Sequence, residues 1–382
     1  MTSNRTAEVA GAGIAGLAVS IALAQRGWKV RAYERSPSLR PDGAGIYIWE
    51  NGLRVLASLG AHDEAVEGCH RGFMRETRDD QNRTVAAAHF AKMPNLRVVS
   101  ITRMKLLTAL SNRARELGVE VVFGTEAVSA TPDGEIRLST GEIRKADLVV
   151  GADGINSKIR DSVNLLRKRT PLADGAIRVM IPRRMDERVS DDGRKYIEYW
   201  NGMRRILVTP CSDTDTYLAF TTLDTDRPGK TVPIDKSLWK KSFPHLRDHI
   251  DRVGEGGRWD LFETIHLKRW HEGRIAIIGD AGHAQAPNLG QGGGCGMMNA
   301  LALAHYVSTC PTIESGLVDW EQRERPLIEH TQRVSSIYSR VAALPPRMQT
   351  VVLTMAGKSR WVLDQRLKAA RHLPTGAEHE FR

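Results

Sequence analysis

The sequence predicts an α/β fold in which a doubly wound parallel sheet holds an inserted antiparallel sheet and is followed by C-terminal helices. Three observations support this prediction. A short apolar segment, a glycine-rich turn and an apolar helical pattern follow one another within residues 7–26. Alternating β-type segments fill much of residues 171–269. After residue 274 one more buried strand leads into a stretch of mostly helical pattern.

The parallel sheet is predicted from short apolar runs that alternate with helical patterns. The helix within residues 103–118 carries leucines at helical spacing and ends at Gly118, where the next strand begins. An earlier helix within residues 43–60 follows a glycine-rich loop and places Leu53, Leu56 and Leu59 on or near one side. The predicted strands of this part are residues 7–10, 29–34, 119–123, 135–139, 147–151 and 274–280.

These patterns divide the chain into two discontinuous domains. Residues 1–70, 99–170 and 270–382 are predicted to form a Rossmann-like nucleotide-binding domain. Residues 71–98 and 171–269 are predicted to form a β-sheet domain that binds the substrate. We find no internal repeat and no low-complexity linker, so we expect the two domains to pack tightly.

The composition indicates a soluble globular protein. Of the 382 residues, 41% are hydrophobic and 26% charged, which is ordinary for that class. A glycine-rich turn interrupts the apolar stretch from Val9 to Ala24, so we do not interpret this stretch as a secretory signal. No run approaches the roughly 18 apolar residues that a membrane span needs. We therefore expect a cytoplasmic protein without a membrane partner.

The net charge of +10 raises the possibility of nucleic-acid binding. The basic residues are interleaved with acids, as in residues 75–83, and no basic helix occurs. We therefore expect the excess charge to be solvated and to steer anionic ligands, with no nucleic acid bound. The cysteines have neither metal-ligand nor redox-motif spacing, so we predict free thiols and no metal site. They are Cys69, Cys211, Cys295 and Cys310.

The N-terminal turn has the spacing of a dinucleotide-binding loop. Gly11 allows the tight turn, Gly13 lets the backbone approach a pyrophosphate, and Gly16 lets the helix pack against the strand. The phosphates would lie at the helix N-terminus, where N–H groups and the dipole favour an anion. Glu34 ends the second strand, where its carboxylate can accept hydrogen bonds from a ribose. The predicted cofactor-binding residues of this segment are Gly11, Gly13, Ala15, Gly16, Glu34 and Arg35.

A glycine-rich turn does not by itself distinguish FAD from NAD, and such turns also serve plain strand-to-helix connections. A second motif, Asp153 and Gly154, follows an apolar strand and is therefore placed where ligands bind in doubly wound sheets. A turn before a capped helix is the alternative interpretation of this motif.

A third motif, within residues 279–300, is more specific. Asp280 ends a buried strand, Pro287 stiffens the loop, and several glycines leave backbone amides bare before a helix begins. Such a loop suits a phosphate or the edge of a flavin that becomes anionic on reduction. The glycines are Gly290, Gly292, Gly293 and Gly294.

Together the three motifs resemble those of the single-component (class A) flavoprotein aromatic hydroxylases, the family of p-hydroxybenzoate hydroxylase. They occur in the same order and at the same separation, and the resemblance covers essentially the whole chain. Residues 43–56, 112–122 and 205–218 most resemble the members that oxygenate an N-heteroaromatic acid and open its ring.

The resemblance implies FAD as the cofactor and NADH or NADPH as the electron donor, with no dedicated nicotinamide domain. It further implies that Glu34 binds the adenosine ribose, Arg103 lies along the FAD and Asp280 contacts the ribityl-pyrophosphate region. The loop from Gly290 to Gly294 would face the isoalloxazine. In the family, the motif at Asp153 is associated with both FAD and NAD(P)H.

The predicted substrate side lies on the inserted sheet. Guanidinium groups hold a carboxylate best, and this segment supplies Arg178 and Arg205. Tyr217 is expected close to Arg205 across a presumed hairpin, and the resemblance supports these two as catalytic residues. Arg75 stands where such family members offer a tyrosine to the substrate, although arginines on a sheet are more often solvated. The predicted substrate-binding residues are Arg75, Arg178, Arg205, Tyr217 and Pro287.

We therefore predict a monooxygenase that hydroxylates a hydroxylated N-heteroaromatic carboxylic acid, such as a hydroxypyridine carboxylate, with or without opening its ring. The resemblance implies a C4a-hydroperoxyflavin as the oxygen donor and O₂ as co-substrate. Tyr217 would hydrogen-bond the ring hydroxyl or relay its proton. The alternative is an FAD-dependent reductase or dehydrogenase of the geranylgeranyl-reductase type, which does not oxygenate. We expect a monomer or a homodimer.

Overall fold

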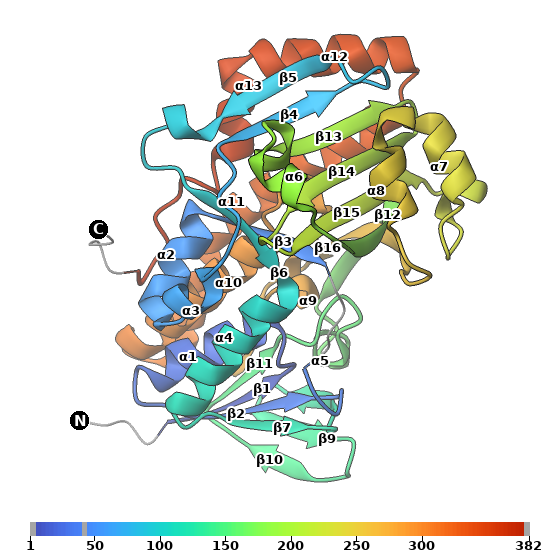
Figure 1. Ribbon diagram of the computed structural model, residues 1–382. Coiled ribbons are helices and arrows are strands. Elements are labelled where there is room, and N and C mark those ends of the chain that lie inside the picture. The colour runs from blue at the N-terminus through green and yellow to red at the C-terminus, as the bar shows by residue number, and fades with distance from the viewer. Residues whose placement is uncertain (1–4, 40–43, 378–382) are drawn as a thin grey trace.

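A six-stranded parallel sheet forms the lower half of the molecule (Figure 1). The computed structural model describes residues 5–39 and 44–377. The strand order is β17-β18-β11-β1-β2-β7, and only the pair β17–β18 is antiparallel. The central strands are almost wholly buried, as expected for a parallel sheet. The strands are β1 (Thr6–Ala10), β2 (Lys29–Glu34), β7 (Glu120–Phe123), β11 (Leu148–Gly151), β17 (His271–Glu272) and β18 (Ile275–Ile277).

Helix α1 (Ile14–Ala24) packs against α4 (Arg103–Glu116) and α10 (Gly292–Thr309) beside this sheet. Their buried side chains, with those of the strands, form the largest hydrophobic core. Two smaller sheets adjoin it. One consists of β8 (Ala127–Thr131), β9 (Glu135–Leu138) and β10 (Ile143–Lys145), and the other of β3 (Gly45–Trp49) and β6 (Val98–Thr102).

A seven-stranded sheet forms the upper half, in the order β16-β12-β15-β14-β13-β4-β5. All its pairs are antiparallel except β13–β4. It joins strands from two distant parts of the chain. They are β4 (Met74–Arg78), β5 (Thr84–His89), β12 (Leu166–Pro182), β13 (Tyr196–Asn201), β14 (Arg204–Pro210), β15 (Asp215–Leu223) and β16 (Trp259–Leu267).

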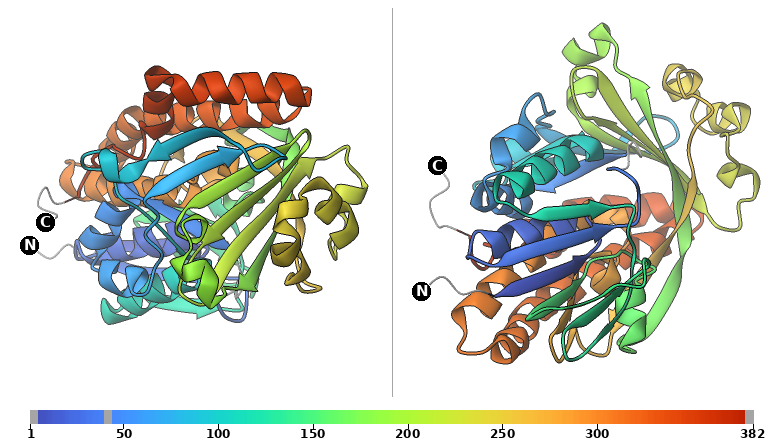
Figure 2. Two further views of the ribbon diagram at one scale, coloured as in Figure 1. Left: turned by 45° about the horizontal axis from the view of Figure 1, so that its top comes forward. Right: turned by 90° about the horizontal axis from the view of Figure 1, so that it is seen from below.

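The two faces of this sheet differ because successive side chains of a strand point to opposite sides. The outer face is apolar: Ile177, Val179 and Phe220 pack with Trp239 and Phe243. Helices α7 (Lys236–Ser242) and α8 (Arg247–Asp251) cover that face, shown in yellow at the right of Figure 2. The inner face is turned toward the parallel sheet (Figure 2).

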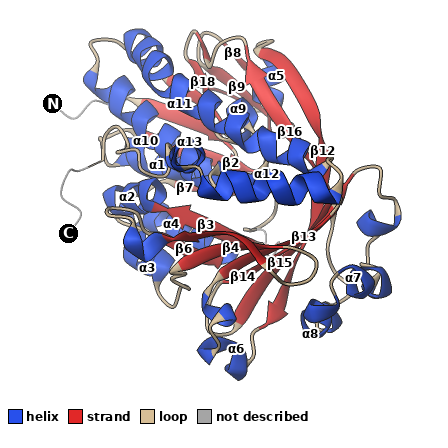
Figure 3. Cartoon of the chain, turned by 90° about the horizontal axis from the view of Figure 1, so that it is seen from above, coloured by secondary structure: helices blue, strands red, loops and turns tan. Residues whose placement is uncertain are grey.

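The C-terminal region is helical. Helix α11 (Ile313–Ala342) packs on α10, and α12 (Pro346–Lys358) lies along the edge strand β5 (Figures 1 and 3). Helix α13 (Arg360–Leu367) contacts both α11 and α12. The shorter helical segments are α2 (Glu50–Leu59), α3 (His62–Val66), α5 (Lys158–Ser162), α6 (Met185–Val189), α9 (Asp280–His283) and the 3-10 turns η1 (Phe90–Lys92), η2 (Asp192–Arg194), η3 (Pro228–Lys230), η4 (Pro244–Leu246) and η5 (Pro287–Leu289).

The predicted fold class is confirmed, with two differences in the elements. Strand β3 was expected as part of a loop, although Ile46 and Ile48 alternate with other residues as in a strand. The strand predicted over residues 274–280 ends earlier, because Gly279 has φ of 60° and Asp280 already begins a helix. No helix of the described residues is long and apolar enough to cross a membrane. The cytoplasmic location stays a prediction.

Candidate active site

The N-terminal glycine turn has the geometry that its motif predicts. A Cβ on Gly11 would lie 2.5 Å from the carbonyl oxygen of Ala152, and one on Gly16 would lie 1.9 Å from the carbonyl oxygen of Gly11. Both positions therefore exclude a side chain. A Cβ on Gly13, by contrast, would meet no protein atom within 4 Å. The protein itself leaves that approach open, which fits a ligand phosphate against the backbone.

Seven predicted cofactor residues line one groove at this turn. Glu34 partly closes it, because its carboxylate accepts hydrogen bonds from the backbone N–H of Ala12 at 3.2 Å and of Ser36 at 3.0 Å. Glu34 thus holds the loop around the groove and keeps acceptor capacity for a ribose. The seven residues are Gly11, Gly13, Glu34, Arg35, Arg103, Asp153 and Gly154.

The second motif forms a turn before a capped helix, and its contact with the cofactor stays a prediction. Ser157 caps helix α5, since its Oγ accepts the N–H of Arg160 at 3.0 Å. Asp153 uses Oδ2 to accept the backbone N–H groups of Lys158 and Ile159. Its other oxygen, Oδ1, is buried and has no hydrogen-bond partner. Burial raises the pKa of Asp153. An orphaned acceptor at the groove fits a ligand hydroxyl or amide.

Arg160 joins the second motif to the third. Its guanidinium is 1% exposed, pairs with Asp161 at 2.7 Å, and donates to the carbonyl oxygens of Ile155 and Ala281. Arg160 was not among the predicted site residues, because an arginine in a short polar segment gives no sign of burial.

The third motif places Asp280 at the end of the parallel sheet. Asp280 is accessible to solvent, but the protein atoms around its carboxylate displace part of its hydration and raise its pKa, while Arg103 and Arg178 lower it in part. These two arginines come from different halves of the molecule. Asp280 therefore lies where the nucleotide groove meets the inner face of the seven-stranded sheet, as a contact to the middle of an extended cofactor requires.

Helix α10 begins at Gly292, and its first turns lie beside the end of the parallel sheet, since a Cβ on Gly296 would be 3.8 Å from Gly279. Its first turn contains no acidic side chain that would compete for the backbone amides there. Gln291, the residue before the helix, is buried, and its Nε2 has no partner, whereas its Oε1 accepts from Asn51 at 3.1 Å. A Cβ on Gly292 would meet nothing within 4 Å. An electron-rich ring edge fits this helix N-terminus.

Ala15 and Gly293 are placed by packing. A Cβ on Gly279 would lie 2.8 Å from the Ala15 side chain, so Ala15 connects the first motif to the third. A Cβ on Gly293 would lie 2.8 Å from Ile46 of β3. The contact of each with FAD stays a prediction.

Strand β3 connects the glycine loop to the seven-stranded sheet. Gly45 packs directly on Tyr217, where a Cβ would lie 2.6 Å from that side chain. Tyr47 contacts Gly290 and is hydrogen-bonded to Thr209 of β14. The sequence analysis missed Tyr47 because it did not predict the strand.

The four predicted substrate residues of the sheet lie on its inner face. Residues directly opposite each other on neighbouring strands share a face. Arg178 is opposite Ala219, which is opposite Leu207, and Leu207 is opposite Glu198. The same alternation places the remaining three on that side: Arg75, Arg205 and Tyr217.

The predicted hairpin exists, but it does not bring Arg205 next to Tyr217. Arg205 is opposite Thr221, and Tyr217 is opposite Thr209. The two residues are thus four positions apart along antiparallel strands, roughly 13 Å. The correction follows from the turn, whose length sets the register and could not be inferred from the residue types.

Arg205 is 2% exposed and already holds carboxylates of the chain itself. It bonds Asp174, lies 3.4 Å from Glu198 and stacks over the Trp200 ring at 4.6 Å. Arg75 donates to the other oxygen of Glu198 at 2.9 Å. Burial raises the pKa of Glu198, but the two arginines outweigh burial and hold this pKa below its usual value. Direct contact of Arg75 or Arg205 with substrate stays a prediction.

Arg205 also reaches the third motif, since it lies 3.4 Å from Asn288. Asn288 in turn donates to the Ser335 carbonyl oxygen at 3.0 Å and lies 3.3 Å from Ser339 on α11. Pro287, next to it, is exposed, as a substrate-facing position requires. The sheet, the loop and α11 therefore meet at one place.

Tyr217 and Arg178 form a second polar group on the inner face. Burial raises the pKa of Tyr217, and Arg178 lowers it in part. The phenol is therefore protonated at neutral pH and is a hydrogen-bond donor. Arg178 pairs with Asp260 at 3.2 Å and lies 5.8 Å from the Phe262 ring centroid. Arg178, too, has a carboxylate partner.

His283 is a structural residue. Its Nε2 lies 2.9 Å from the Asn299 amide, and its ring packs on Trp270. Burial lowers its pKa to about 4, so the imidazole is neutral at physiological pH. Asn299 also accepts from Trp320 Nε1 at 2.6 Å. These contacts fix α10 under the loop of the third motif.

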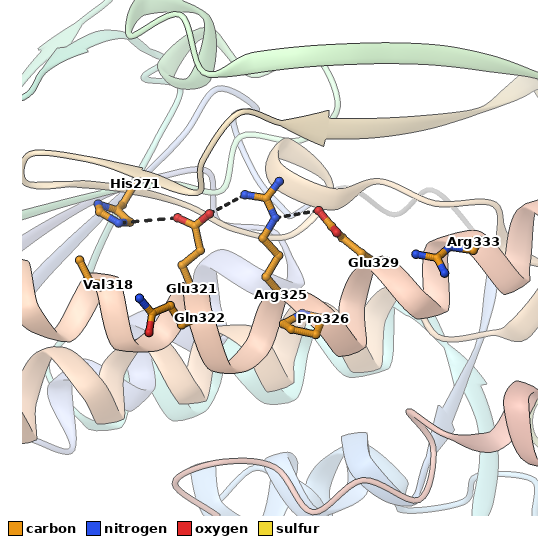
Figure 4. Close-up of a pocket in the computed structure, with 8 residues that line it drawn as sticks. All are labelled: His271, Val318, Glu321, Gln322, Arg325, Pro326, Glu329 and Arg333. Carbon is orange, nitrogen blue, oxygen red and sulfur yellow. Dashed lines mark hydrogen bonds and ion pairs between the residues drawn. The ribbon is translucent and has the colours of Figure 1, made fainter.

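A second groove runs along α11, and none of the predicted site residues lines it (Figure 4). Four of its polar side chains are linked to one another. Arg325 contacts Glu321 at 2.5 Å and Glu329 at 2.7 Å, and Glu321 lies 3.6 Å from His271. Glu321 also accepts the backbone N–H of Trp270. This network fastens α11 to the edge of the parallel sheet.

Within the described chain, one group of three side chains has metal-ligand spacing: Glu187, Asp248 and His249. Arg184 lies 2.6 Å from Asp248, and Arg252 contacts both carboxylates. Their charge is already compensated, so we assign no metal to them.

Comparisons with known proteins agree with this geometry. The model of the FAD binding domain family matches residues 5–314. A protein of Rhodococcus erythropolis described as a putative 2-heptyl-3-hydroxy-4(1H)-quinolone synthase is 42% identical, over 97% of each chain. The 2-heptyl-3-hydroxy-4(1H)-quinolone synthase of Mycobacteroides abscessus is 39% identical, over 94% of this chain and 96% of that one.

The solved structure of the tetrameric form of 2-methyl-3-hydroxypyridine-5-carboxylic acid oxygenase is also similar. It has a TM-score of 0.88 and 40% identity, and the match covers 97% of both chains. The monomer or homodimer predicted for this chain stays a prediction. The family model, the relatives and the arrangement of the three glycine motifs agree. The chain belongs to the FAD binding domain family as a class A flavoprotein hydroxylase, and it is an FAD-dependent aromatic monooxygenase.

Proposed function

We propose that this enzyme uses NADH or NADPH and O₂ to hydroxylate a ring carbon of an N-heteroaromatic compound that carries an oxygen substituent on its ring. Its substrate is a 2-alkyl-4-quinolone rather than a carboxylic acid. The nicotinamide donor is inferred from the family resemblance. The proposal keeps the division into an FAD-binding part and a substrate-binding sheet.

The pairing of the inner-face arginines carries this proposal. Arg75 and Arg205 share Glu198, Arg205 also holds Asp174, and Arg178 pairs with Asp260. A substrate carboxylate held by Arg75, Arg178 or Arg205 would have to displace an internal partner of that arginine and leave it without its counter-charge, which is costly for the buried partners. A quinolone, which has no carboxylate, avoids this cost. The relatives named as quinolone synthases support the same choice.

When bound, the reduced flavin activates O₂ for transfer of one oxygen atom to the ring. The residues of the chain would orient the ring and exclude water. Tyr217 would donate a hydrogen bond to the substrate, since burial keeps its phenol protonated. Leu207 and Ala219, between the two polar groups of the inner face, would contact the flat ring. A closed apolar site protects the activated oxygen from water.

The test is a comparison of two substrate classes with the purified holoenzyme. NADH and NADPH oxidation and O₂ uptake are followed with a 2-alkyl-4-quinolone and, separately, with hydroxypyridine carboxylic acids. We expect the quinolone to stimulate oxidation and to yield a product heavier by one oxygen atom, labelled when ¹⁸O₂ is used. If only the acids stimulate oxidation, the substrate is a carboxylic acid and the quinolone proposal is wrong. If neither class is oxygenated, the proposal fails.

The second candidate is the hydroxypyridine carboxylic acid, with or without ring opening. It is favoured by the structural relative that is named an oxygenase of such an acid, at 40% identity. The mass of the product distinguishes the two outcomes of that reaction, because ring opening by oxygenation adds two oxygen atoms and one hydroxylation adds a single one.

A further inference from the structure

Helix α13 directs an arginine toward the inner side of the molecule. Leu363, Leu367 and Ala370 belong to a hydrophobic cluster with Trp49 and Phe90. Arg366 lies between them in sequence, at the i, i+3 and i+4 spacing that shares one helical face. It is half-buried. Partial burial lowers the pKa of the Arg366 guanidinium from its ordinary value.

Arg366 has no hydrogen bond and no ion pair with any residue of the described chain. Its one specific contact is the ring of Tyr338 on α11, 5.0 Å from the guanidinium carbon to the centroid. An arginine offers five N–H donors and stays charged even when its pKa falls. A half-buried guanidinium without an anionic partner can bind an anionic ligand, because it is always charged and donates in a planar fork.

The charges around Arg366 do not balance. Arg75 and Glu198 both act electrostatically on it, and Tyr338 lies close to Arg75 as well. The cluster contains three guanidinium groups, those of Arg75, Arg205 and Arg366, and two carboxylates, those of Asp174 and Glu198. The two carboxylates neutralise two of the three cations. One positive charge is left, and Arg366 is the member without a partner.

This cluster lies next to the loop of the third motif. Tyr338 is a neighbour in sequence of Ser339, and Ser335 is one turn earlier on α11. Both serines contact Asn288 of that loop, and Ser335 also donates to the Ala286 carbonyl oxygen at 2.6 Å. The uncompensated charge therefore lies where α11 and α13 approach the loop that is expected to face the flavin.

We propose that Arg366 is a substrate-binding residue that holds one negatively charged oxygen of the aromatic substrate. This inference rests on the proposed function and adds the ligand's charge to it. The oxygen is the ring oxyanion of the 4-quinolone, in its 4-hydroxyquinoline tautomer, or the carboxylate of an acid substrate. The ring oxyanion suits the reaction better, since ionisation of a ring oxygen raises the electron density of the adjacent carbon. Binding the anion removes the residual charge of the cluster.

The experiment uses the holoenzyme of the wild type, of Arg366→Met and of Arg366→Lys. Arg333→Met is the matched control, because Arg333 is an exposed arginine of the same region, on the groove of Figure 4. Three probes are titrated: 4-nitrophenol, whose anion is coloured, a 2-alkyl-4-quinolone, and a hydroxypyridine carboxylate. Flavin absorbance gives the affinity, and the absorbance of the 4-nitrophenol gives the ionisation state of the bound ring oxygen at each pH.

In the wild type we expect 4-nitrophenol and the quinolone to bind, with the pKa of bound 4-nitrophenol lowered. In Arg366→Met the affinity is expected to fall about tenfold to a hundredfold and the lowered pKa to be lost, because a charge-assisted hydrogen bond disappears. Arg366→Lys should restore part of both, and Arg333→Met should match the wild type. If only the carboxylate probe responds to Arg366, the carboxylate is the bound group.

Two results overturn the inference. One is that Arg366→Met binds all three probes as the wild type does with unchanged pH dependence, even if its stability falls. The other is that the wild type binds none of the probes. The failure of the proposed function looks different: 4-nitrophenolate binding depends on Arg366, while no quinolone is hydroxylated.

Discussion

The nucleotide groove and the inner face of the seven-stranded sheet are constructed in different ways. The groove is made mostly of backbone: Gly11 and Gly16 permit close approach, and Gly13 leaves space for a ligand. The inner face is made of side chains that come from five strands and neutralise one another, as Arg205 does with Asp174 and Glu198. A backbone site can be recognised from spacing alone, whereas a side-chain site depends on partners that only the register supplies.

The difference predicts where charge is indispensable. Asp174→Ala is expected to have the largest effect on stability, about 3–5 kcal/mol, because it leaves Arg205 buried with only part of its compensation. Unfolding by urea, followed by circular dichroism, measures this loss. Asp364→Ala is the control, since its pair with Arg371 is exposed and should contribute less than about 1 kcal/mol. If Asp174→Ala lost less than about 1 kcal/mol, the inner-face network would not be a closed charge cluster.

The groove offers a matched pair of glycine variants. Gly16→Ala places a Cβ 1.9 Å from the Gly11 carbonyl oxygen. This variant is expected to lose about 1–3 kcal/mol of stability and also to bind FAD more weakly. Gly13→Ala meets no protein atom, so the apoprotein should keep its stability within about 1 kcal/mol and yet bind FAD more weakly. Apoprotein unfolding and FAD titration separate the two effects. Equal FAD affinity in Gly13→Ala and the wild type would contradict the assigned role of Gly13.

The same difference explains what could be predicted from the sequence. The motifs at Gly11 and Asp153 could be recognised from the sequence, and they line one groove, because they depend on local backbone shape. The contacts of these motifs and of Asp280 with FAD stay a prediction. The arginines of the inner face were predicted by residue type, but their partners were not, since Glu198 is 123 residues from Arg75 and Asp174 is 31 residues from Arg205. Nor could helical spacing in the C-terminal region indicate which face of α13 would meet the sheet.

The free energy of unfolding should depend on pH through His283, which lies in the third motif. Burial lowers the folded-state pKa of His283 to about 4, below the ordinary 6.5. The unfolded chain therefore binds more protons between these values, so this contribution is full above pH 6.5 and is lost as the pH falls toward 4. Between pH 7 and pH 5 the loss from this one residue is about 2 kcal/mol.

His283→Gln is expected to reduce that difference by a similar amount, although the variant is less stable overall because it loses the packing on Trp270. Urea midpoints at pH 5 and pH 7 test it, and a comparison of pH 7 with pH 8 is the control, since both lie above the titration. An unchanged drop between pH 7 and pH 5 would mean that His283 is accessible to protons in the folded state.

The smallest predicted effect divides the second motif into its two components. Ser157 is fully buried and caps α5, so Ser157→Ala should cost about 1 kcal/mol of stability and leave FAD affinity nearly unchanged. Asp153→Asn is expected to weaken FAD binding. It replaces one acceptor oxygen, either the orphaned Oδ1 or the Oδ2 that accepts backbone N–H groups, with an amide donor. If Ser157→Ala released FAD as strongly as Asp153→Asn, the motif would act as one unit, and side chains would define this part of the groove as fully as they define the sheet.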